Sequence, residues 1–353
     1  MTNQDVTQAI AVDAMGSDMG PDEVVAGVAL ALKNGWVPDK VIIVGQEQVI
    51  EEAIRKNGLE ADPRAGSFAA SEVIEMNEKP VQSLRAKKDS SLVRTVELVK
   101  IGTCAAAVSC GNTGSLMACA TLKLRPVEGV SKPALASVWP SLKHKFIVLD
   151  VGANPQCRPE NLLHYAILGH QYARDALSIE KPRIGILSIG TEEGKGTDLT
   201  DRAHQLLKGL GDQIHYIGLV EGFQLFNNEV DVVVTDGFTG NVILKTCESL
   251  WQMLKGLIGE EIRRNPLRMA GALLLRGGLK NARNRLDPKK HGGAPLLGLR
   301  GTVLKAHGSS NREAIANAIR IAGVAIRHDL SGHTLKAIAN ANDTLGDELA
   351  NSA

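Results

Sequence analysis

The amino-acid sequence predicts an α/β fold built on a mostly parallel sheet with helices on both faces. Three observations support this prediction. Short apolar runs alternate with helical segments along almost the whole chain. Glycine and polar residues follow the apolar runs, as they do where parallel strands turn into helices. The 353 residues are 44% hydrophobic and 22% charged, which is typical of a globular protein large enough for two lobes around a cleft.

Strands are expected where a short apolar run is bounded by turn residues. In chain order these runs are 9–13, 41–44, 105–109, 135–139, 146–150, 183–188 and 230–235. Helices are expected where apolar residues recur at helical spacing, several of them starting at proline or asparagine. These segments are 21–33, 46–56, 91–101, 113–124, 159–176, 199–210, 241–258 and 311–327. We therefore expect one domain spanning 1–353, in which ligands bind beyond the carboxyl ends of the strands.

Composition excludes several functional classes. Aromatic residues make up only 3% of the chain and the formal net charge is +1, so we expect no nucleic-acid partner. No apolar run approaches the roughly 20 residues of a membrane-spanning helix, and Met1 to Gln8 does not resemble a signal peptide. Five cysteines without a Cys-x-x-Cys pair and nine scattered histidines predict a reducing cytosol, no metal and no cofactor.

Two glycine loops follow predicted strands and precede predicted helices. The first contains Gly111, Asn112, Thr113 and Gly114; the second contains Asp236, Gly237, Thr239, Gly240 and Asn241. A strand that ends in Gly-x-Thr-Gly and turns into a helix presents backbone N–H groups and the positive end of the helix dipole to a small pocket. Two such loops favour an anion site, although each alone is equally compatible with an ordinary βα turn.

Other polar residues lie at predicted strand ends or near the loops. They are Asp13, Asn154, His307, Lys245 and Lys195. Lys195 lies in a glycine-rich segment that fails the residue count of a nucleotide P-loop. No Gly-x-Ser-x-Gly elbow is present, and Cys110 is interpreted as a packing residue rather than a nucleophile. Five strand ends with such side chains indicate one cleft.

A basic segment interrupts the alternation of strands and helices. Nine Lys or Arg and one acid give residues 263–290 a charge of +8, which leaves −7 on the rest of the chain. An apolar patch with Leu273, Leu274 and Leu275 lies between Arg263, Arg264 and Arg268 on one side and Arg276 on the other. This pattern predicts a basic and apolar helical protrusion over 259–292 that binds an anionic membrane or an acidic protein, or that packs against a second subunit.

The chain contains six motifs in this order: VDAMGSD from Val12, SCGNTG from Ser109, LDVGAN from Leu149, SIGTEEGKG from Ser188, TDGFTGNV from Thr235 and GAPLLG from Gly293. Over about 9–327 they closely resemble the bacterial phosphate acyltransferase (PlsX) family of phospholipid synthesis. The resemblance implies the phosphate acetyltransferase and isocitrate-type dehydrogenase fold. It implies transfer of a long-chain acyl group from acyl carrier protein to inorganic phosphate, giving acyl phosphate for a membrane acyltransferase that acts on glycerol 3-phosphate. It also implies a homodimer in the cytoplasm that associates with the inner face of the cell membrane.

With this reaction in view, phosphate is expected between the two glycine loops. Lys195 or Lys245 would supply positive charge, and Asn112 or Asn241 would donate to the oxyanion. The second loop is the stronger candidate for catalysis, because Asp236, Asn241 and Lys245 give it more polar groups. Two rival functions are a nicotinamide-dependent oxidoreductase and a non-catalytic scaffold at the membrane.

Overall fold

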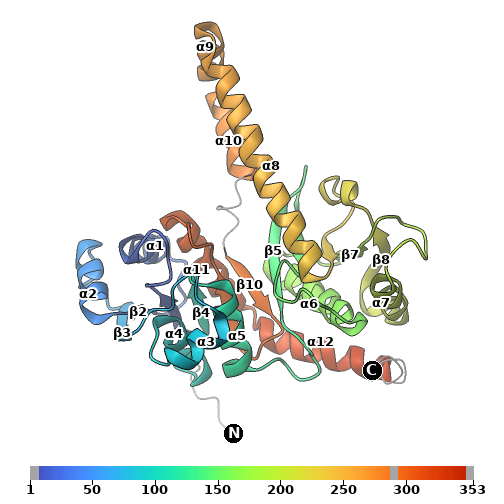
Figure 1. Ribbon diagram of the computed structural model, residues 1–353, viewed down its shortest axis with the longest axis horizontal. Coiled ribbons are helices and arrows are strands. Elements are labelled where there is room, and N and C mark those ends of the chain that lie inside the picture. Colours follow the sequence, from blue (N-terminus) through green and yellow to red (C-terminus); the bar gives the residue numbers. More distant parts are fainter. Residues whose placement is uncertain (1–7, 287–292, 347–353) are drawn as a thin grey trace.

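A single sheet of eleven strands forms the centre of the protein (Figure 1). The computed structural model describes residues 8–286 and 293–346. The strand order is β3-β2-β1-β4-β11-β10-β5-β6-β9-β7-β8. The strands are β1 (Ile10–Asp13), β2 (Val41–Gly45), β3 (Ala65–Ala69), β4 (Ala106–Ser109), β5 (Ala134–Pro140), β6 (Lys145–Leu149), β7 (Arg183–Leu187), β8 (His215–Val220), β9 (Val232–Val234), β10 (Ala294–Leu297) and β11 (Thr302–Lys305).

The sheet consists of two parallel blocks joined by antiparallel strands. In the first block β3, β2, β1, β4 and β11 run parallel, and in the second β6, β9, β7 and β8 run parallel. Between them β10 is antiparallel to both of its neighbours, and β5 is antiparallel to β6. The prediction of a mostly parallel sheet is confirmed. The antiparallel junction, which makes the two blocks run in opposite directions, is an additional finding.

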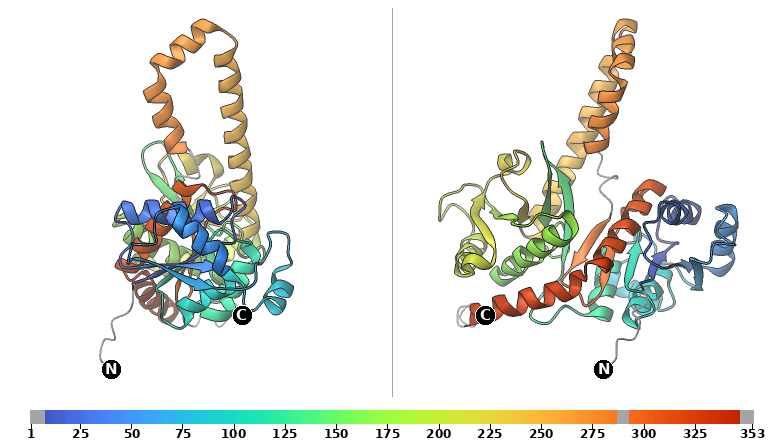
Figure 2. Two further views of the ribbon diagram at one scale, coloured as in Figure 1. Left: turned by 90° about the vertical axis from the view of Figure 1, so that its left-hand side faces the viewer. Right: turned by 180° about the vertical axis from the view of Figure 1, so that it is seen from behind.

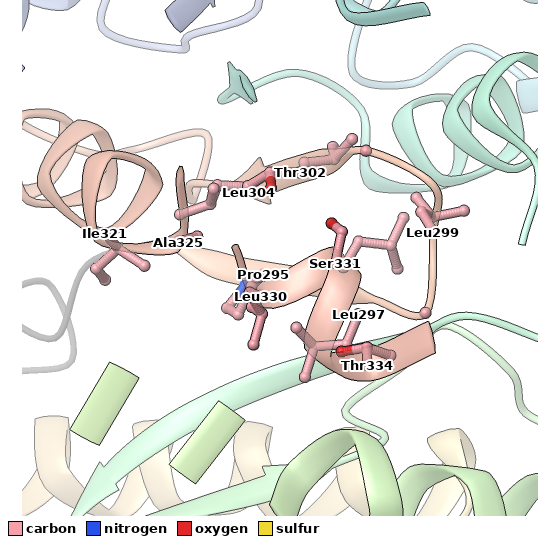
Figure 3. Close-up of a pocket in the computed structure, with 14 residues that line it drawn as sticks. Pro295, Leu297, Leu299, Thr302, Leu304, Ile321, Ala325, Leu330, Ser331 and Thr334 are labelled. Atoms are coloured by element: carbon pink, nitrogen blue, oxygen red, sulfur yellow. The ribbon is translucent and has the colours of Figure 1, made fainter. Parts of the chain in front are cut away.

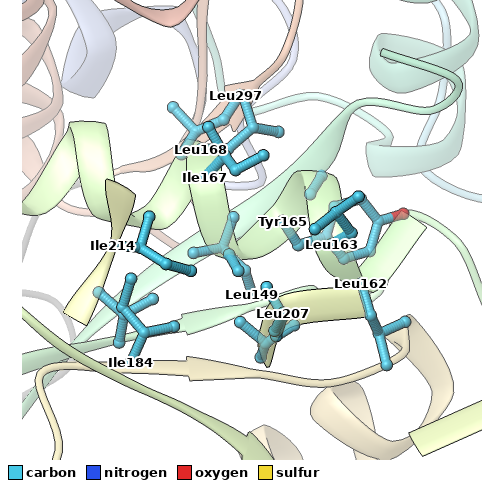
Figure 4. Close-up of a cluster of buried hydrophobic side chains, with 14 of the residues drawn as sticks. Leu149, Leu162, Leu163, Tyr165, Ile167, Leu168, Ile184, Leu207, Ile214 and Leu297 are labelled. Atoms are coloured by element: carbon cyan, nitrogen blue, oxygen red, sulfur yellow. The ribbon is translucent and has the colours of Figure 1, made fainter. Parts of the chain in front are cut away.

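Three large apolar clusters are buried between the sheet and the helices that cover both of its faces. These helices are α1 (Pro21–Lys33), α2 (Glu47–Lys56), α3 (Pro80–Ala86), α4 (Ser91–Lys100), α5 (Thr113–Leu124), α6 (Pro159–Leu177), α7 (Asp198–Gly209), α11 (Arg312–Arg327) and α12 (Leu330–Thr344). One cluster joins α1 and α11 to the first block, another joins α4 and α5 to the middle of the sheet, and the third joins α6, α7 and α12 to the second block. Figure 4 shows the third cluster, in which Leu149 and Ile184 from the strands meet Leu163 and Leu207 from the helices.

A long arm leaves the body of the molecule after β9, which lies between β6 and β7 in the second block. It comprises α8 (Gly237–Arg263), α9 (Pro266–Leu274) and α10 (Arg276–Leu286). Figures 1 and 2 show α8 running away from the sheet, α9 crossing at the tip and α10 returning. The predicted helix 241–258 is therefore the middle of a longer one. Of the expected protrusion over 259–292, residues 287–292 lie outside the described residues.

Candidate active site

Asp13 lies beside the first glycine loop because β1 pairs with β4, with Asp13 directly opposite Ser109. The Ser109 hydroxyl donates to Asp13 Oδ2 at 2.6 Å, and the Gly111 N–H donates to Ser109 Oγ at 3.0 Å. A Cβ atom on Gly16 would lie 2.6 Å from Gly111 Cα, so glycine is needed where these two loops touch. Burial raises the pKa of Asp13, while hydrogen bonds from Ser109 and Ser91 oppose that shift.

Asn112 acts as the N-cap of α5. Its Oδ1 accepts from the Ser115 N–H at 2.9 Å. Its Nδ2 donates to the carbonyl oxygens of Met76 at 2.8 Å and Glu78 at 3.1 Å. The amide proposed as an oxyanion donor is thus fully used in this conformation to join α5 to the loop before α3.

The second glycine loop is closed by its own aspartate. Asp236 Oδ1 accepts from the N–H groups of Phe238 at 3.0 Å and Thr239 at 2.9 Å, and its Oδ2 accepts from the Thr239 hydroxyl at 2.7 Å. The Gly237 N–H donates to the Asn154 carbonyl oxygen at 2.9 Å, and the Gly240 N–H donates back to Asp236. All four backbone N–H groups of Gly237–Gly240 therefore already have partners.

The loop after β6 lies against this second loop. The fully buried Asp150 accepts from the backbone N–H groups of Leu135 at 3.0 Å, Gly152 at 3.2 Å, Ala153 at 2.9 Å and Asn154 at 2.6 Å. The amide of Asn154 also donates to Asp150 Oδ2, to the Pro133 carbonyl and to the Tyr165 hydroxyl. Asn154 thus fixes the shape of this loop.

Lys305, which the sequence did not single out, lies under the first glycine loop at the end of β11. Only 8% of this residue is exposed. Its Nζ donates to the Cys110 carbonyl oxygen at 3.1 Å and to that of Ala306. Burial lowers the pKa of Lys305 to about 8. The segment 302–305 is short and was not recognised as a strand, so nothing in the sequence distinguished this lysine from a surface residue.

α8 brings Lys245 toward this buried lysine. Lys245 Nζ forms an ion pair with Glu248 Oε2 at 2.8 Å on the same helix. After burial, the largest effect, the charges of Lys245 and Lys305 further lower the pKa of His307. The charge of Lys245 likewise lowers the pKa of Lys305. Lys245 on α8 is therefore near enough to Lys305 and His307 for its charge to act on both.

Other predicted residues lie in more ordinary surroundings. The side chain of Asn241 lies against Gly152 in the loop after β6. A Cβ atom added to Gly152 would be 3.4 Å from Asn241 Oδ1. Lys195 forms an ion pair with Glu192 at 2.9 Å within its own exposed loop after β7. Cys110 is 2% exposed, and burial raises the pKa of its thiol to about 12. The thiol is therefore protonated at neutral pH, in keeping with its interpretation as a packing residue.

The arm carries the predicted basic and apolar patch. Leu273, Leu274 and Leu275 are 69%, 88% and 64% exposed where α9 ends and α10 begins. Arg264 and Arg268 both pair with Glu261 at the end of α8. Over residues 8–286 and 293–346, no helix is long and apolar enough to cross a membrane.

No group of three or more His, Cys, Asp or Glu residues in the described part of the chain could hold a metal ion. An open pocket of about 450 Å³ lies between the loop after β7 and the start of α7 and is lined by Glu193, Gly194, Asp198, Asp201, Arg202, His204 and Gln205. An apolar cavity of about 20 Å³ lies between β10, β11 and the helices α11 and α12 (Figure 3). Thr302 and Leu304 face Leu330 and Thr334 across it. Its volume holds about one water molecule.

The chain is similar to known proteins in both sequence and fold. A sequence model of the family described as "Fatty acid synthesis protein" matches residues 8–332. A phosphate acyltransferase from Thermoanaerobacter pseudethanolicus is 40% identical over 97% of this chain and 99% of the relative. One from Desulfitobacterium hafniense is 45% identical over 89% of this chain and 92% of the relative. A phosphotransacetylase structure from Streptococcus pyogenes superposes with a TM-score of 0.62 at 18% identity, covering 91% of this chain and 94% of that chain, and so shares the fold.

Proposed function

Because the chain belongs to the fatty acid synthesis protein family, we propose that it is an acyltransferase that transfers a long-chain fatty acyl group to inorganic phosphate. The donor is acyl carrier protein, and the product is an acyl phosphate used in phospholipid synthesis. The relatives that match nearly the full chain are named phosphate acyltransferases, which supports the proposal.

The observation that carries this proposal is the buried Lys305, whose Nζ donates to the Cys110 carbonyl oxygen at the first glycine loop at 3.1 Å. The charge of Lys245 on α8 also acts on this lysine. A thioester is already activated, so the reaction requires mainly that phosphate be held in line with the carbonyl carbon. Two lysines and the start of α5 can bind the anion and stabilise the negative charge that develops on the carbonyl oxygen. No covalent intermediate is required, in keeping with the inert thiol of Cys110.

The arm is proposed to bind the other partners. Carrier proteins of this class are acidic, and the basic residues Arg263, Arg264, Arg268 and Arg276 complement such a surface. The exposed leucines Leu273–Leu275 would enter the interfacial region of an anionic membrane, with the protein at its cytoplasmic face beside the acyltransferase that consumes the product.

A second copy of the chain is proposed to pack along α8. Five large apolar side chains there are 42% to 52% exposed and recur at helical spacing: Leu250, Met253, Leu254, Leu257 and Ile258. An apolar stripe on a helix that leaves the body of a protein is expected to pack against another apolar surface. We propose that this surface is the same stripe of α8 on a partner subunit in a homodimer.

One assay tests the proposed reaction against its rivals. Long-chain acyl carrier protein is mixed with the protein and phosphate, and both free thiol and acyl phosphate separated from the carrier protein are measured. The proposal expects equal amounts of both products, each dependent on phosphate. A scaffold would give neither product. An oxidoreductase would instead change the fluorescence of a reduced nicotinamide cofactor on binding.

Two sets of substitutions separate the roles within the arm. Replacing Arg263, Arg264, Arg268 and Arg276 with glutamine is expected to weaken binding to both acyl carrier protein and phosphatidylglycerol vesicles. Replacing Leu273, Leu274 and Leu275 with serine is expected to weaken vesicle binding alone. The matched control changes four exposed lysines outside the arm to glutamine: Lys33, Lys40, Lys100 and Lys143. If the arginine variant binds both partners as tightly as the control at physiological salt, the arm does not recruit them.

A further inference from the structure

Lys305 is a buried cation that forms no ion pair with a described carboxylate, although the charges of the buried Asp13 and of Asp18 act on it. It ends β11, which lies between β4 and β10 at the centre of the sheet. Two of its three N–H groups donate to the carbonyl oxygens of Cys110 and Ala306. Among the described residues no acceptor pairs with the third N–H, and no carboxylate lies within ion-pair distance. Burying an ammonium group is costly unless an anion compensates it, so the arrangement calls for an anionic ligand.

The start of α5 is close in sequence to the carbonyl group that Lys305 contacts. Cys110, whose carbonyl Lys305 contacts, is two residues before the N-cap Asn112. The N-cap satisfies the N–H of Ser115, whereas the N–H groups of Thr113 and Gly114 have no partner among the described residues. The two glycine loops differ in this respect, since every N–H at the start of α8 is engaged.

We propose that Lys305 is a catalytic residue that binds inorganic phosphate together with the backbone N–H groups of Thr113 and Gly114. This inference rests on the proposed acyl transfer and deepens it. It assigns phosphate to the first glycine loop and leaves the second loop, with Lys245, to face the thioester. Lysine and a helix N-terminus are complementary to an oxyanion in charge and in hydrogen-bond donors.

The step balances without any further reactant. An oxygen of hydrogen phosphate attacks the thioester carbonyl carbon, forming the C–O bond of the acyl phosphate. The C–S bond breaks, and the thiol of the carrier's prosthetic group leaves with the proton that the hydrogen phosphate carried. Lys305 remains an ammonium throughout and holds the nucleophile in place.

Lys305→Met tests the side chain, with Lys123→Met as a control for a lysine that is ion-paired on the surface. Wild-type protein is first shown to release thiol in a phosphate-dependent manner. If it does not, the proposed function fails before the role of Lys305 is tested. If it does, Lys305→Met is expected to raise the KM for phosphate about 10- to 100-fold, the usual effect of losing one charge-assisted hydrogen bond. Ethylammonium should partly restore phosphate use to Lys305→Ala, which a purely structural role would not allow.

Thr113→Pro tests the backbone without touching the buried lysine. Proline is well accepted at the first position of a helix, where it removes only the N–H. The preceding Asn112 has φ −51° and ψ 119°, a conformation compatible with a following proline. Thr113→Ala is the matched control, because it removes the hydroxyl and keeps the N–H. Thr113→Pro is expected to raise the KM for phosphate more than Thr113→Ala does.

The wild-type pH profile gives a measurement that needs no variant. The titratable groups around Lys305 are Asp13 and Asp18, Cys110 and His307, with Lys245 and Glu248 on α8. Between about pH 7.5 and about pH 9 phosphate stays dianionic while Lys305 loses its proton, so the KM for phosphate should rise. A flat KM over this range, or an unchanged KM in both Lys305→Met and Thr113→Pro, would overturn the assignment.

Discussion

Replacing Asp150 with asparagine should destabilise the protein measurably, because the buried carboxylate organises the loop after β6. Its Oδ1 accepts from three backbone N–H groups, and its Oδ2 accepts from the backbone N–H of Asn154 at 2.6 Å and from the amide of Asn154 at 3.2 Å. Asparagine retains one acceptor oxygen and replaces the other with an NH₂ group. Both donors of Asn154 would then face another donor.

The structure sets the size of the effect. A buried donor left without an acceptor costs about 1–3 kcal/mol, so the backbone N–H of Asn154 accounts for about 2 kcal/mol of the free energy of unfolding. The side-chain amide of Asn154 keeps the Pro133 carbonyl and the Tyr165 hydroxyl as acceptors, so its share is small. Burial raises the pKa of Asp150, and neutral asparagine avoids this cost of burying a charge. The expected net loss is therefore smaller, about 1 kcal/mol.

Guanidinium unfolding, followed by circular dichroism, gives the free energy of unfolding. The control is Asp343→Asn, an exposed position on α12, which should change the free energy by less than about 0.5 kcal/mol. The role assigned to these hydrogen bonds would be refuted if Asp150→Asn lost no more free energy of unfolding than the control. This comparison requires that the slope of the free energy against denaturant concentration is the same in both variants.

Three further outcomes are expected. Gly240→Ala should lower the free energy of unfolding by about 3 kcal/mol or more, because the added Cβ would overlap a carbonyl oxygen of the neighbouring loop. Gly256→Ala, in the open middle of α8, is the control and should be neutral or slightly stabilising. Asp231 is buried, yet hydrogen bonds and charge from Arg183 hold its pKa below the ordinary value. This stabilisation is complete above about pH 4 and should be lost as the pH falls further, and Arg183→Met should flatten that loss in acid unfolding curves. Lys245→Ala should reduce turnover at least about tenfold with an unchanged thermal midpoint, and full activity would remove this exposed side chain from the site.

Much of the fold could be predicted because several strands are fully buried. The runs that form β1, β4 and β9 are short and β-branched or alanine-rich, and they end in polar residues, so the sequence alone located them. Two of the missed strands, β3 and β10, lack that pattern. β3 has the sequence AGSFA and is largely exposed, and β10 contains a proline. The antiparallel junction could not be predicted, because it depends on which strands pair and not on how each strand looks.

The candidate site, like the fold, could be predicted from the sequence only in part. Glycine loops are recognisable from local sequence, and the structure places both loops at strand ends as expected. Which N–H groups remain available to a ligand depends on hydrogen bonds to Asp236 and Asn112, and the sequence does not reveal these partners. Lys305 could not be predicted, because its burial arises from packing between β4 and β10.

The position of β10 and β11 has a consequence for how the chain is synthesised and folds. These strands fill the centre of the sheet but come from near the end of the chain. After β4 leaves the ribosome, roughly 190 residues must follow before β11 can pair with it, which takes about 10 to 40 seconds at typical rates of translation. During that time β4 and β5 both present open hydrogen-bonding edges, which are prone to pair with other chains. We expect nascent chains that stop short of β10 to be the aggregation-prone species, and chaperone binding to be concentrated on them.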